Sequence, residues 1–200
     1  MPAAGSTTER PPRGEARRTL ITEAALAVIA RVGPDGLTHR LVAAEAGLPV
    51  AATTYWFASK EDMVRAALEH AAERDLRYLD TLRTASRGWT RATLAAELAA
   101  MVQEACTTRR ENAVVDGALW LEALRRPELR PVARRWNDEW VAFCAEVLRN
   151  VGARARAADA ALLAASVDGL ISHGLVADGP FDRAAVVAAL RRLVAALTAE

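Results

Sequence analysis

Apolar side chains recur at helical spacing through nearly all of this 200-residue chain, and this periodicity is the strongest constraint on its fold. One run steps by four, four, three and four positions, through Val132, Trp136, Trp140, Phe143 and Val147. Such steps place side chains on one face of an α-helix, whereas a half-buried strand would alternate at every second residue. No segment shows a strand pattern. We therefore predict an all-α fold of about nine helices.

Glycine, proline and capping residues mark the ends of the first three predicted helices. The first covers residues 15–31 and stops at the stretch VGPDG. Thr38 supplies an N-cap oxygen for a second helix, which ends at Gly47. Pro49 presets the backbone for the first turn of a third helix, which is complete by Phe57. The third helix is too short to be stable alone, so it must pack against its neighbours.

A longer fourth helix is predicted to connect two domains. Ser59 and Asp62 form a shortened capping box that starts this helix. Residues 1–12 are rich in Pro, Ala, Ser and Thr, so we expect a disordered arm there. We assign residues 13–60 to a first domain and residues 61–200 to a larger one. The helices predicted beyond the fourth cover residues 90–108, 112–125, 128–151, 157–177 and 182–198.

Composition and charge limit the possible functions. Twenty-six Lys and Arg residues balance 25 Asp and Glu residues, so a nucleic-acid-binding surface must be a local patch. Cys106 and Cys144 lack CxxC spacing, which favours free thiols over a disulfide. The chain begins without an apolar signal-peptide region and has no run of about 18 apolar residues. We therefore expect a cytoplasmic protein without a membrane span.

The usual sequence signs of catalysis or metal binding do not occur. We find no acidic dyad, no nucleophile elbow, no Gly-rich phosphate loop and no His/Cys cluster with metal-ligand spacing. The sequence therefore predicts neither an enzyme nor a bound metal or cofactor.

The first three predicted helices have the outline of a helix-turn-helix. In that motif two short helices follow a longer one, and the second short helix enters the major groove of DNA. Here that helix carries Ala51 and Ala52, which permit close approach to DNA, and Thr53, Thr54 and Tyr55, whose hydroxyls suit phosphates or base edges. The sequence therefore predicts a DNA-binding domain.

The stretch LTHRLVAAEAGLPVAATTYWFASKEDMV, residues 37–64, resembles the DNA-binding region of the TetR family of transcriptional regulators. The shared pattern is a Thr-capped helix, a Gly-containing turn, a short recognition helix ending in an aromatic pair, and then Ser-Lys-Glu. The resemblance covers residues 15–65, and the rest agrees in being helical and of the expected length. It implies a homodimer that binds a palindromic operator, and that usually represses transcription until a small ligand binds in the C-terminal domain.

The resemblance also implies the residues that contact DNA. Thr38 matches the cap that donates to a phosphate, Lys60 matches a phosphate-binding lysine, and Tyr55 and Trp56 match the aromatic pair, with Phe57 packing inward. Trp56 has an alternative role as core filler. The whole predicted set is Thr38, His39, Arg40, Val50, Ala51, Ala52, Thr53, Thr54, Tyr55, Trp56 and Lys60.

The sequence departs from the commoner family pattern at Pro49, where a serine is frequent, and at Val50, Ala51 and Ala52, where a polar residue and glycine are frequent. No Arg, Asn or Gln lies between Val50 and Phe57. The bidentate base contacts of those side chains are therefore missing. Specificity should depend on thymine methyl contacts, Arg40, DNA shape and the N-terminal arginines. Those arginines could instead form a solvated charge run; they are Arg10, Arg13, Arg17 and Arg18.

The last two predicted helices carry long apolar stripes that we assign to a four-helix dimer interface. The alternative is an ordinary monomer core. The stripes consist of Leu163, Val167, Leu170, Gly174, Val186, Leu190, Leu193 and Leu197.

A ligand pocket is expected among the middle helices, where large apolar side chains lie. The alternative role of most of the five tryptophans is core packing. Glu122 and His173 are the polar groups expected to orient a ligand. Glu122 could instead pair with Arg125 or Arg126, and His173 could hydrogen-bond across the dimer interface. The predicted pocket residues are Met101, Cys106, Trp120, Glu122, Trp136, Trp140, Phe143, Cys144 and His173.

The leading hypothesis is a repressor whose partners are an operator in double-stranded DNA and a small-molecule effector. The alternative is a helical small-molecule carrier or interaction protein with a non-functional helix-turn-helix. The low net charge and the missing base-reading side chains keep this alternative open.

Overall fold

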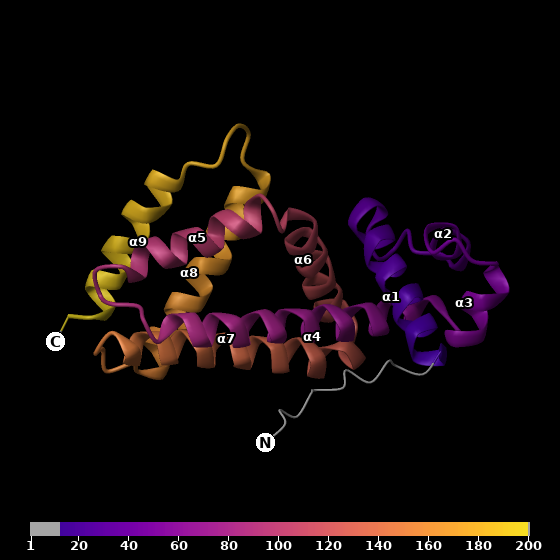
Figure 1. Cartoon of the computed structure of the whole chain (residues 1–200), viewed down its shortest axis with the longest axis horizontal. Helices are drawn as coiled ribbons and strands as arrows, with labels where there is room; N and C mark the ends of the chain where they lie inside the picture. Colours follow the sequence, from indigo (N-terminus) through magenta and orange to yellow (C-terminus); the bar gives the residue numbers. More distant parts are fainter. Residues whose placement is uncertain (1–12, 200) are drawn as a thin grey trace, which may run out of the picture. The chain divides into compact units, whose positions relative to one another are not determined.

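The computed structural model describes residues 13–199, which fold into α-helices without any strand (Figure 1). The all-α prediction is confirmed; the predicted arm, residues 1–12, lies outside the described residues. One 3₁₀ turn, η1 (Pro127–Leu129), precedes α7. The helices are α1 (Arg13–Val32), α2 (His39–Glu45), α3 (Val50–Trp56), α4 (Lys60–Ser86), α5 (Leu94–Cys106), α6 (Arg110–Arg125), α7 (Arg130–Asn150), α8 (Ala157–Val176) and α9 (Arg183–Leu197).

The chain forms two compact units, one up to Ala67 and one from Leu68 onward. Helices α1–α3 and the start of α4 make the first unit, and the rest of α4 with α5–α9 makes the second. The domain boundary at residues 60 and 61 stays a prediction.

Local signals in the sequence position the helices of the first unit. The Thr38 hydroxyl accepts a hydrogen bond from the Leu41 amide at 3.2 Å, which confirms the predicted cap of α2. Gly47 has a φ of 64°, a conformation that costs glycine little, and it turns the chain toward α3. Pro49 is the N-cap of α3 and has extended backbone angles, so it lies one residue before the first turn rather than in it.

The start of α4 is the predicted capping box. The Asp62 amide donates to the Ser59 hydroxyl at 3.1 Å, and that hydroxyl lies 3.0 Å from the Asp62 carboxylate. This reciprocal pair satisfies one of the free amides at the helix start.

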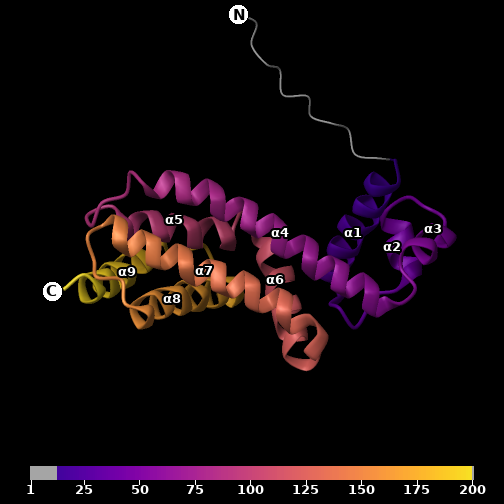
Figure 2. The same ribbon diagram turned by 90° about the horizontal axis from the view of Figure 1, so that it is seen from below.

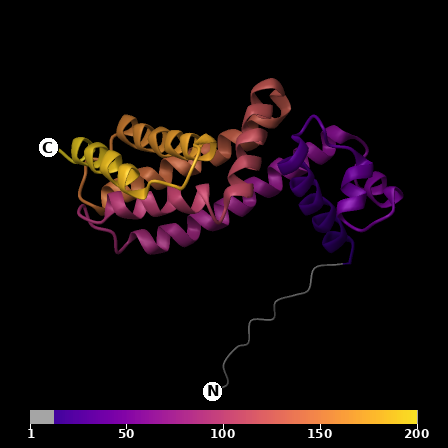
Figure 3. The same ribbon diagram turned by 90° about the horizontal axis from the view of Figure 1, so that it is seen from above.

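Helix α5 lies at the centre of the second unit, where it packs against α8 and α9 (Figure 2). The core contains side chains from α5, α7, α8 and α9, among them Leu98, Phe143, Leu163, Val167 and Leu190, all with at most 1% of their surface exposed. Figure 3 shows α8 and α9 side by side.

This packing corrects the predicted dimer interface. Leu163, Val167 and Leu190 are buried in the core of their own chain, and a Cβ atom at Gly174 would lie 2.5 Å from the Cys106 sulfur, so this close approach occurs inside the unit. The remaining members of the two stripes are half-buried against the same core: Leu170, Val186, Leu193 and Leu197. Leu163, Val167 and Leu190 therefore belong to the monomer core, whereas an interface role of the half-buried members stays a prediction.

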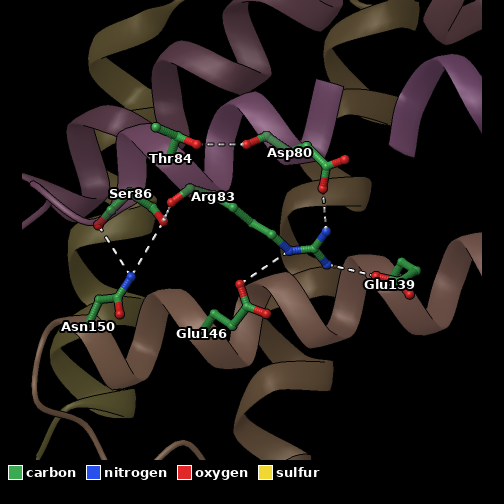
Figure 4. A network of polar contacts seen from close by, with 7 residues as sticks. All are labelled: Asp80, Arg83, Thr84, Ser86, Glu139, Glu146 and Asn150. Carbon is green, nitrogen blue, oxygen red and sulfur yellow. Dashed lines mark hydrogen bonds and ion pairs between the residues drawn. The ribbon is translucent and has the colours of Figure 1, made fainter. Parts of the chain in front are cut away.

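A polar network joins α4 to α7, which run side by side in the same direction (Figure 4). The Arg83 guanidinium donates to Glu139 at 2.8 Å and to Glu146 at 3.2 Å on α7. It also donates to Asp80 one turn earlier on α4, at 3.0 Å. A single arginine thus donates to three carboxylates and links the two helices.

Helix α8 is long and apolar enough to cross a membrane by length and composition alone, with a mean hydropathy of 1.3. The sequence analysis expected no such segment. One helix of this kind is weak evidence for a membrane span, because core helices of soluble proteins have the same composition. The inner face of α8 packs against α5 and α7.

Candidate DNA-binding surface and ligand pocket

The exposed side chains of helix α3 are mostly small and apolar, and Tyr55 adds a hydroxyl group near the end of the helix. Val50 is 45% exposed and Tyr55 is 79% exposed, and Ala51 and Thr54 are also exposed. The Tyr55 ring meets the Trp56 ring edge-on, with 5.2 Å between centroids. The small residues leave the backbone of α3 accessible, as a helix that enters a DNA groove requires.

Thr53 does not belong to this surface, which corrects the prediction that it contacts DNA. Its side chain is completely buried, and its hydroxyl donates to the Val50 carbonyl at 2.8 Å. The same oxygen lies 3.1 Å from Nδ1 of His39. Thr53 and half-buried His39 therefore hold α3 against α2.

Two predicted phosphate contacts also have partners within the protein. The exposed Thr38 hydroxyl accepts from the Leu41 amide, which leaves its own hydrogen free to donate. The Lys60 ammonium donates to the Asp35 carbonyl at 2.7 Å and has two further donors. Both side chains can still reach a phosphate.

The remaining predicted DNA-contacting residues fall into two groups. Arg40 is exposed, whereas Ala52 and Trp56 are half-buried. The Trp56 ring packs near the start of α1, 3.3 Å from where a Cβ atom on Gly14 would lie, so this indole has a structural role. Phe57 is 3% exposed and packs inward as predicted.

The N-terminal arginines divide in a similar way. Arg17 and Arg18 are exposed on α1, and the Arg18 guanidinium lies over the Phe57 ring at 5.6 Å. Arg10 and the side chain of Arg13 lie outside the described residues.

A mostly apolar cavity of about 380 Å³ lies within the second unit, with walls from α4, α5, α6, α7 and α8. Four predicted residues line it: Met101, Trp120, Trp136 and Trp140. The Trp120 and Trp136 rings meet at 61°, with 5.7 Å between centroids. The cavity is of the size that encloses small organic ligands.

The other five predicted pocket residues do not line the cavity. Phe143 and Cys144 are buried in the core beside it, with Phe143 stacked on Trp140. Cys106 packs against Gly174, and His173 is exposed. Both cysteines are free, as predicted.

Glu122 is also absent from the pocket, although it is 98% buried. Its carboxylate accepts from Arg125 at 2.7 Å and forms an ion pair with Arg126. The alternative interpretation of Glu122, an ion pair at helical spacing, is therefore correct.

A network of charged side chains on the α4 and α6 walls was not predicted from the sequence. Arg74 donates to Asp116 at 2.6 Å and to Asp75 at 3.2 Å, and Arg109 donates to Asp75 at 3.2 Å. Burial raises the pKa of Asp116, and the neighbouring Asp75 carboxylate raises it further, although Arg74 opposes both effects. The Arg109 guanidinium also lies 3.8 Å from the centre of the Tyr78 ring.

Asp168 on α8 is the third carboxylate on the pocket wall, and no Lys, Arg or His of the described chain forms an ion pair with it. Burial raises its pKa to about 6, and the nearby Trp140 indole N–H opposes this shift. No acceptor completes a hydrogen bond to that N–H, so Nε1 of Trp140 is the one buried side-chain nitrogen or oxygen in residues 13–199 without a hydrogen-bond partner.

A signal for Asp168 was present in the sequence. It is the one charged residue in the apolar stretch ALLAASVDGLISHGLV, residues 161–176. Burying a carboxylate in such a stretch costs free energy unless it is paired or hydrogen-bonded, so its presence indicates a function. Asp75 and Asp116 lie among many charged residues and give no comparable signal.

Comparison with known proteins agrees with this arrangement. Residues 21–67 match the family described as "Bacterial regulatory proteins, tetR family", and residues 89–196 match "Tetracyclin repressor-like, C-terminal domain". The chain belongs to the TetR family. The second match covers more than half of the chain and contains most of the cavity walls.

Characterised relatives of this TetR-family chain are also regulators. The HTH-type transcriptional regulator BetI of Burkholderia thailandensis is 32% identical over 182 residues, which cover 86% of this chain and 89% of that protein. BetI of Paraburkholderia xenovorans is 29% identical with the same coverage. The chain is therefore a helix-turn-helix transcriptional regulator by family, and this family is not one of enzymes.

Solved structures give the same fold. The multidrug binding protein EbrR complexed with ethidium is 36% identical, with a TM-score of 0.69 over 88% of this chain and 98% of that one. A TetR-family member from Streptomyces coelicolor A3 is also 36% identical, with a TM-score of 0.72 over 88% and 97% of the two chains. The TetR fold predicted from residues 37–64 is confirmed.

Proposed function

We propose that this TetR-family chain is a transcriptional repressor that binds a palindromic operator as a homodimer and is released by a small ligand. One observation carries the proposal: a single chain combines an exposed recognition helix in one unit with a mostly apolar cavity of about 380 Å³ in the other. In a repressor of this kind the bound ligand favours a dimer whose two DNA-binding units are spaced too differently to fit the operator. By linkage, operator DNA weakens ligand binding by the same factor.

The exposed side chains of α3 and α2 form the proposed DNA contact. Val50, Ala51 and Thr54 would meet base edges and thymine methyl groups, and Tyr55 and Arg40 would donate to phosphates. Thr38 and Lys60 add phosphate contacts through the donors that their internal bonds leave free. Specificity then depends on methyl contacts and DNA shape.

The homodimer would form through the outer faces of α8 and α9, not through the buried Leu163, Val167 and Leu190. Only 22% of the apolar window of α8 is buried within the chain, and Leu162 and Val176 are 51% and 81% exposed. Exposed Ala188 and Ala189 on α9 allow a second copy to approach closely. A second copy that covers these faces would remove an exposed apolar surface unusual for a monomer.

The effector would be a small organic molecule. EbrR has been crystallised with ethidium, malachite green and proflavin, and it is 34–36% identical to this chain in those complexes. The cavity of this chain is mostly apolar and lined with tryptophans, which suits flat aromatic ligands of this kind. Action on DNA places the protein in the cytoplasm.

The test is DNA binding by the full chain, by gel shift on the intergenic DNA flanking its own gene at two salt concentrations. We expect a specific shift whose log affinity falls with log salt by about 0.9 per phosphate neutralised. Tyr55→Ala and Arg40→Ala should each weaken binding about tenfold with helicity unchanged. Arg77→Ala is the matched control, because Arg77 is an exposed arginine in the second unit.

The carrier alternative rests on the lack of Arg, Asn and Gln between Val50 and Phe57. It predicts flat salt dependence and equal DNA affinity in all three variants. That result would overturn the repressor proposal.

A further inference from the structure

We propose that the cavity is a site for organic cations and that the Asp168 carboxylate neutralises the positive charge of the ligand. This inference rests on the proposed ligand-binding role of the second unit. It assigns the ligand's charge and the residue that recognises it.

The three carboxylates on the pocket wall differ in the cations already bound to them. Asp75 and Asp116 contact Arg74, and Asp75 also contacts Arg109. The positive charges of Arg74 and Arg109 therefore already balance these two carboxylates. Asp168 has no such partner in the described part of the chain, so its negative charge is available to a cation that enters the cavity.

The walls around Asp168 suit the apolar body of an aromatic cation. Trp120, Trp136 and Trp140 line the same cavity, together with Met101 and Ile171. Indole rings attract cations through their faces and pack against flat aromatic rings. The burial of Asp168 also strengthens the attraction between the cation and the carboxylate.

The Trp140 indole N–H gives an independent sign of a missing partner. Trp140 is 95% buried, and its Nε1 has no acceptor. A buried donor without an acceptor is costly, so native structures rarely leave one unmatched. Because this N–H lies near Asp168, it can donate to the ionised carboxylate and hold it in place for a cation.

The charged groups around Asp168 indicate how pH affects the site. The groups lining the cavity are Asp75 and Tyr78 on α4, Asp116 on α6 and Arg109 before it, while α5 and α9 contribute none. Cys144 on α7 is also near, and burial and the Asp168 charge keep its pKa raised, so this thiol stays neutral. A cation binds the ionised carboxylate, so its affinity should fall as the pH drops below about 6, where Asp168 is protonated.

The experiment measures binding of two fluorescent probes to the full chain without DNA. Ethidium is a permanent aromatic cation, and Nile red is a neutral aromatic molecule. We expect Asp168→Asn to weaken ethidium binding about tenfold to a hundredfold at about pH 7.5 and to leave Nile red binding within about twofold. Asp159→Asn is the matched control, because Asp159 lies on the same helix and does not line the cavity.

A pH series separates a charge effect from a change in pocket shape. Ethidium affinity of the unaltered protein should fall about tenfold per pH unit below about pH 6, and this slope should vanish in Asp168→Asn. Nile red affinity should not change with pH in either protein.

Three outcomes would overturn the inference. In the first, Asp168→Asn binds ethidium as tightly as the unaltered protein. In the second, Asp116→Asn abolishes ethidium binding while Asp168→Asn does not, which would place the cation at the α4–α6 wall. In the third, Nile red binds and ethidium does not; this leaves the proposed ligand-binding function intact, whereas failure of both probes would count against that function as well.

Discussion

Nδ1 of His39 on α2 lies 3.1 Å from the hydroxyl oxygen of Thr53 on α3. That hydroxyl also donates to the Val50 carbonyl at 2.8 Å, and the Thr53 side chain is completely buried. Since α3 has only seven residues, it cannot be stable alone. The pair therefore helps to fix the angle at which the recognition helix is presented.

Thr53→Val keeps the shape of this side chain and removes its hydroxyl. We expect the free energy of unfolding to fall by about 1–2 kcal/mol, because the His39 ring and the Val50 carbonyl lose the buried Thr53 hydroxyl as a hydrogen-bond partner. Urea denaturation followed by circular dichroism measures the loss. Thr54→Val is the matched control, since Thr54 is exposed, and its effect should stay within about 0.5 kcal/mol. Equal effects of the two changes would show that the His39 contact stabilises nothing.

Glu122→Gln tests the buried ion pair at the end of α6. The carboxylate is 2% exposed and binds Arg125 and Arg126, so its neutralisation should cost about 1–3 kcal/mol of stability. Thermal unfolding measures this cost. Glu111→Gln, at an exposed site on the same helix, should leave the melting temperature unchanged. Because Glu122 lies outside the cavity, ethidium affinity should not change; a large loss of affinity would restore the sequence-based prediction that Glu122 orients a ligand.

The stability of the ligand-free protein should depend on pH through Asp168. Its pKa is about 6 in the folded chain and near 3.8 ordinarily, so the folded state binds more protons between these values. The free energy of unfolding should therefore fall as the pH rises from about 4 to 6 and stay lower above that range. Asp168→Asn should remove this fall and stabilise the protein by about 1–3 kcal/mol at neutral pH.

Chemical denaturation of both proteins at several pH values checks this prediction. The raised pKa of Asp116 contributes a fall of the same sign, so the difference between the two proteins isolates Asp168. Parallel pH profiles would mean that Asp168 has an ordinary pKa.

Leu162→Asp should turn the proposed dimer into a monomer. Leu162 is 51% exposed on the outer face of α8, and a carboxylate there would meet its copy across a two-fold interface. Light scattering coupled to gel filtration measures the mass. Leu20→Asp is the control, because Leu20 is 41% exposed on α1 in the other unit, and it should leave the mass unchanged. A dimer that survives Leu162→Asp would place the interface elsewhere.

Local patterns in the sequence were sufficient for the helices and for the family. The caps at Thr38 and Ser59 and the left-handed Gly47 depend on residues one to three positions apart, so the chain order alone specifies them. The resemblance in residues 37–64 depends on the same local pattern.

Tertiary packing decided which face of each helix is buried. Leu163 and Val167 were expected at a dimer interface, yet they belong to the monomer core; Thr53 was expected on the DNA surface, yet it is buried. Helix α8 is apolar on nearly all sides, so its periodicity cannot distinguish a core face from an interface face.

The sequence by itself determined an all-helical TetR-family regulator, with its recognition helix and most of its helix boundaries. Only the tertiary structure decided which side chains line the cavity, because Trp140 and Asp168 come from helices whose contact depends on packing across the second unit. It also showed that Glu122 has ion-pair partners while Asp168 has none among residues 13–199, since the charge balance of a carboxylate depends on its neighbours in space.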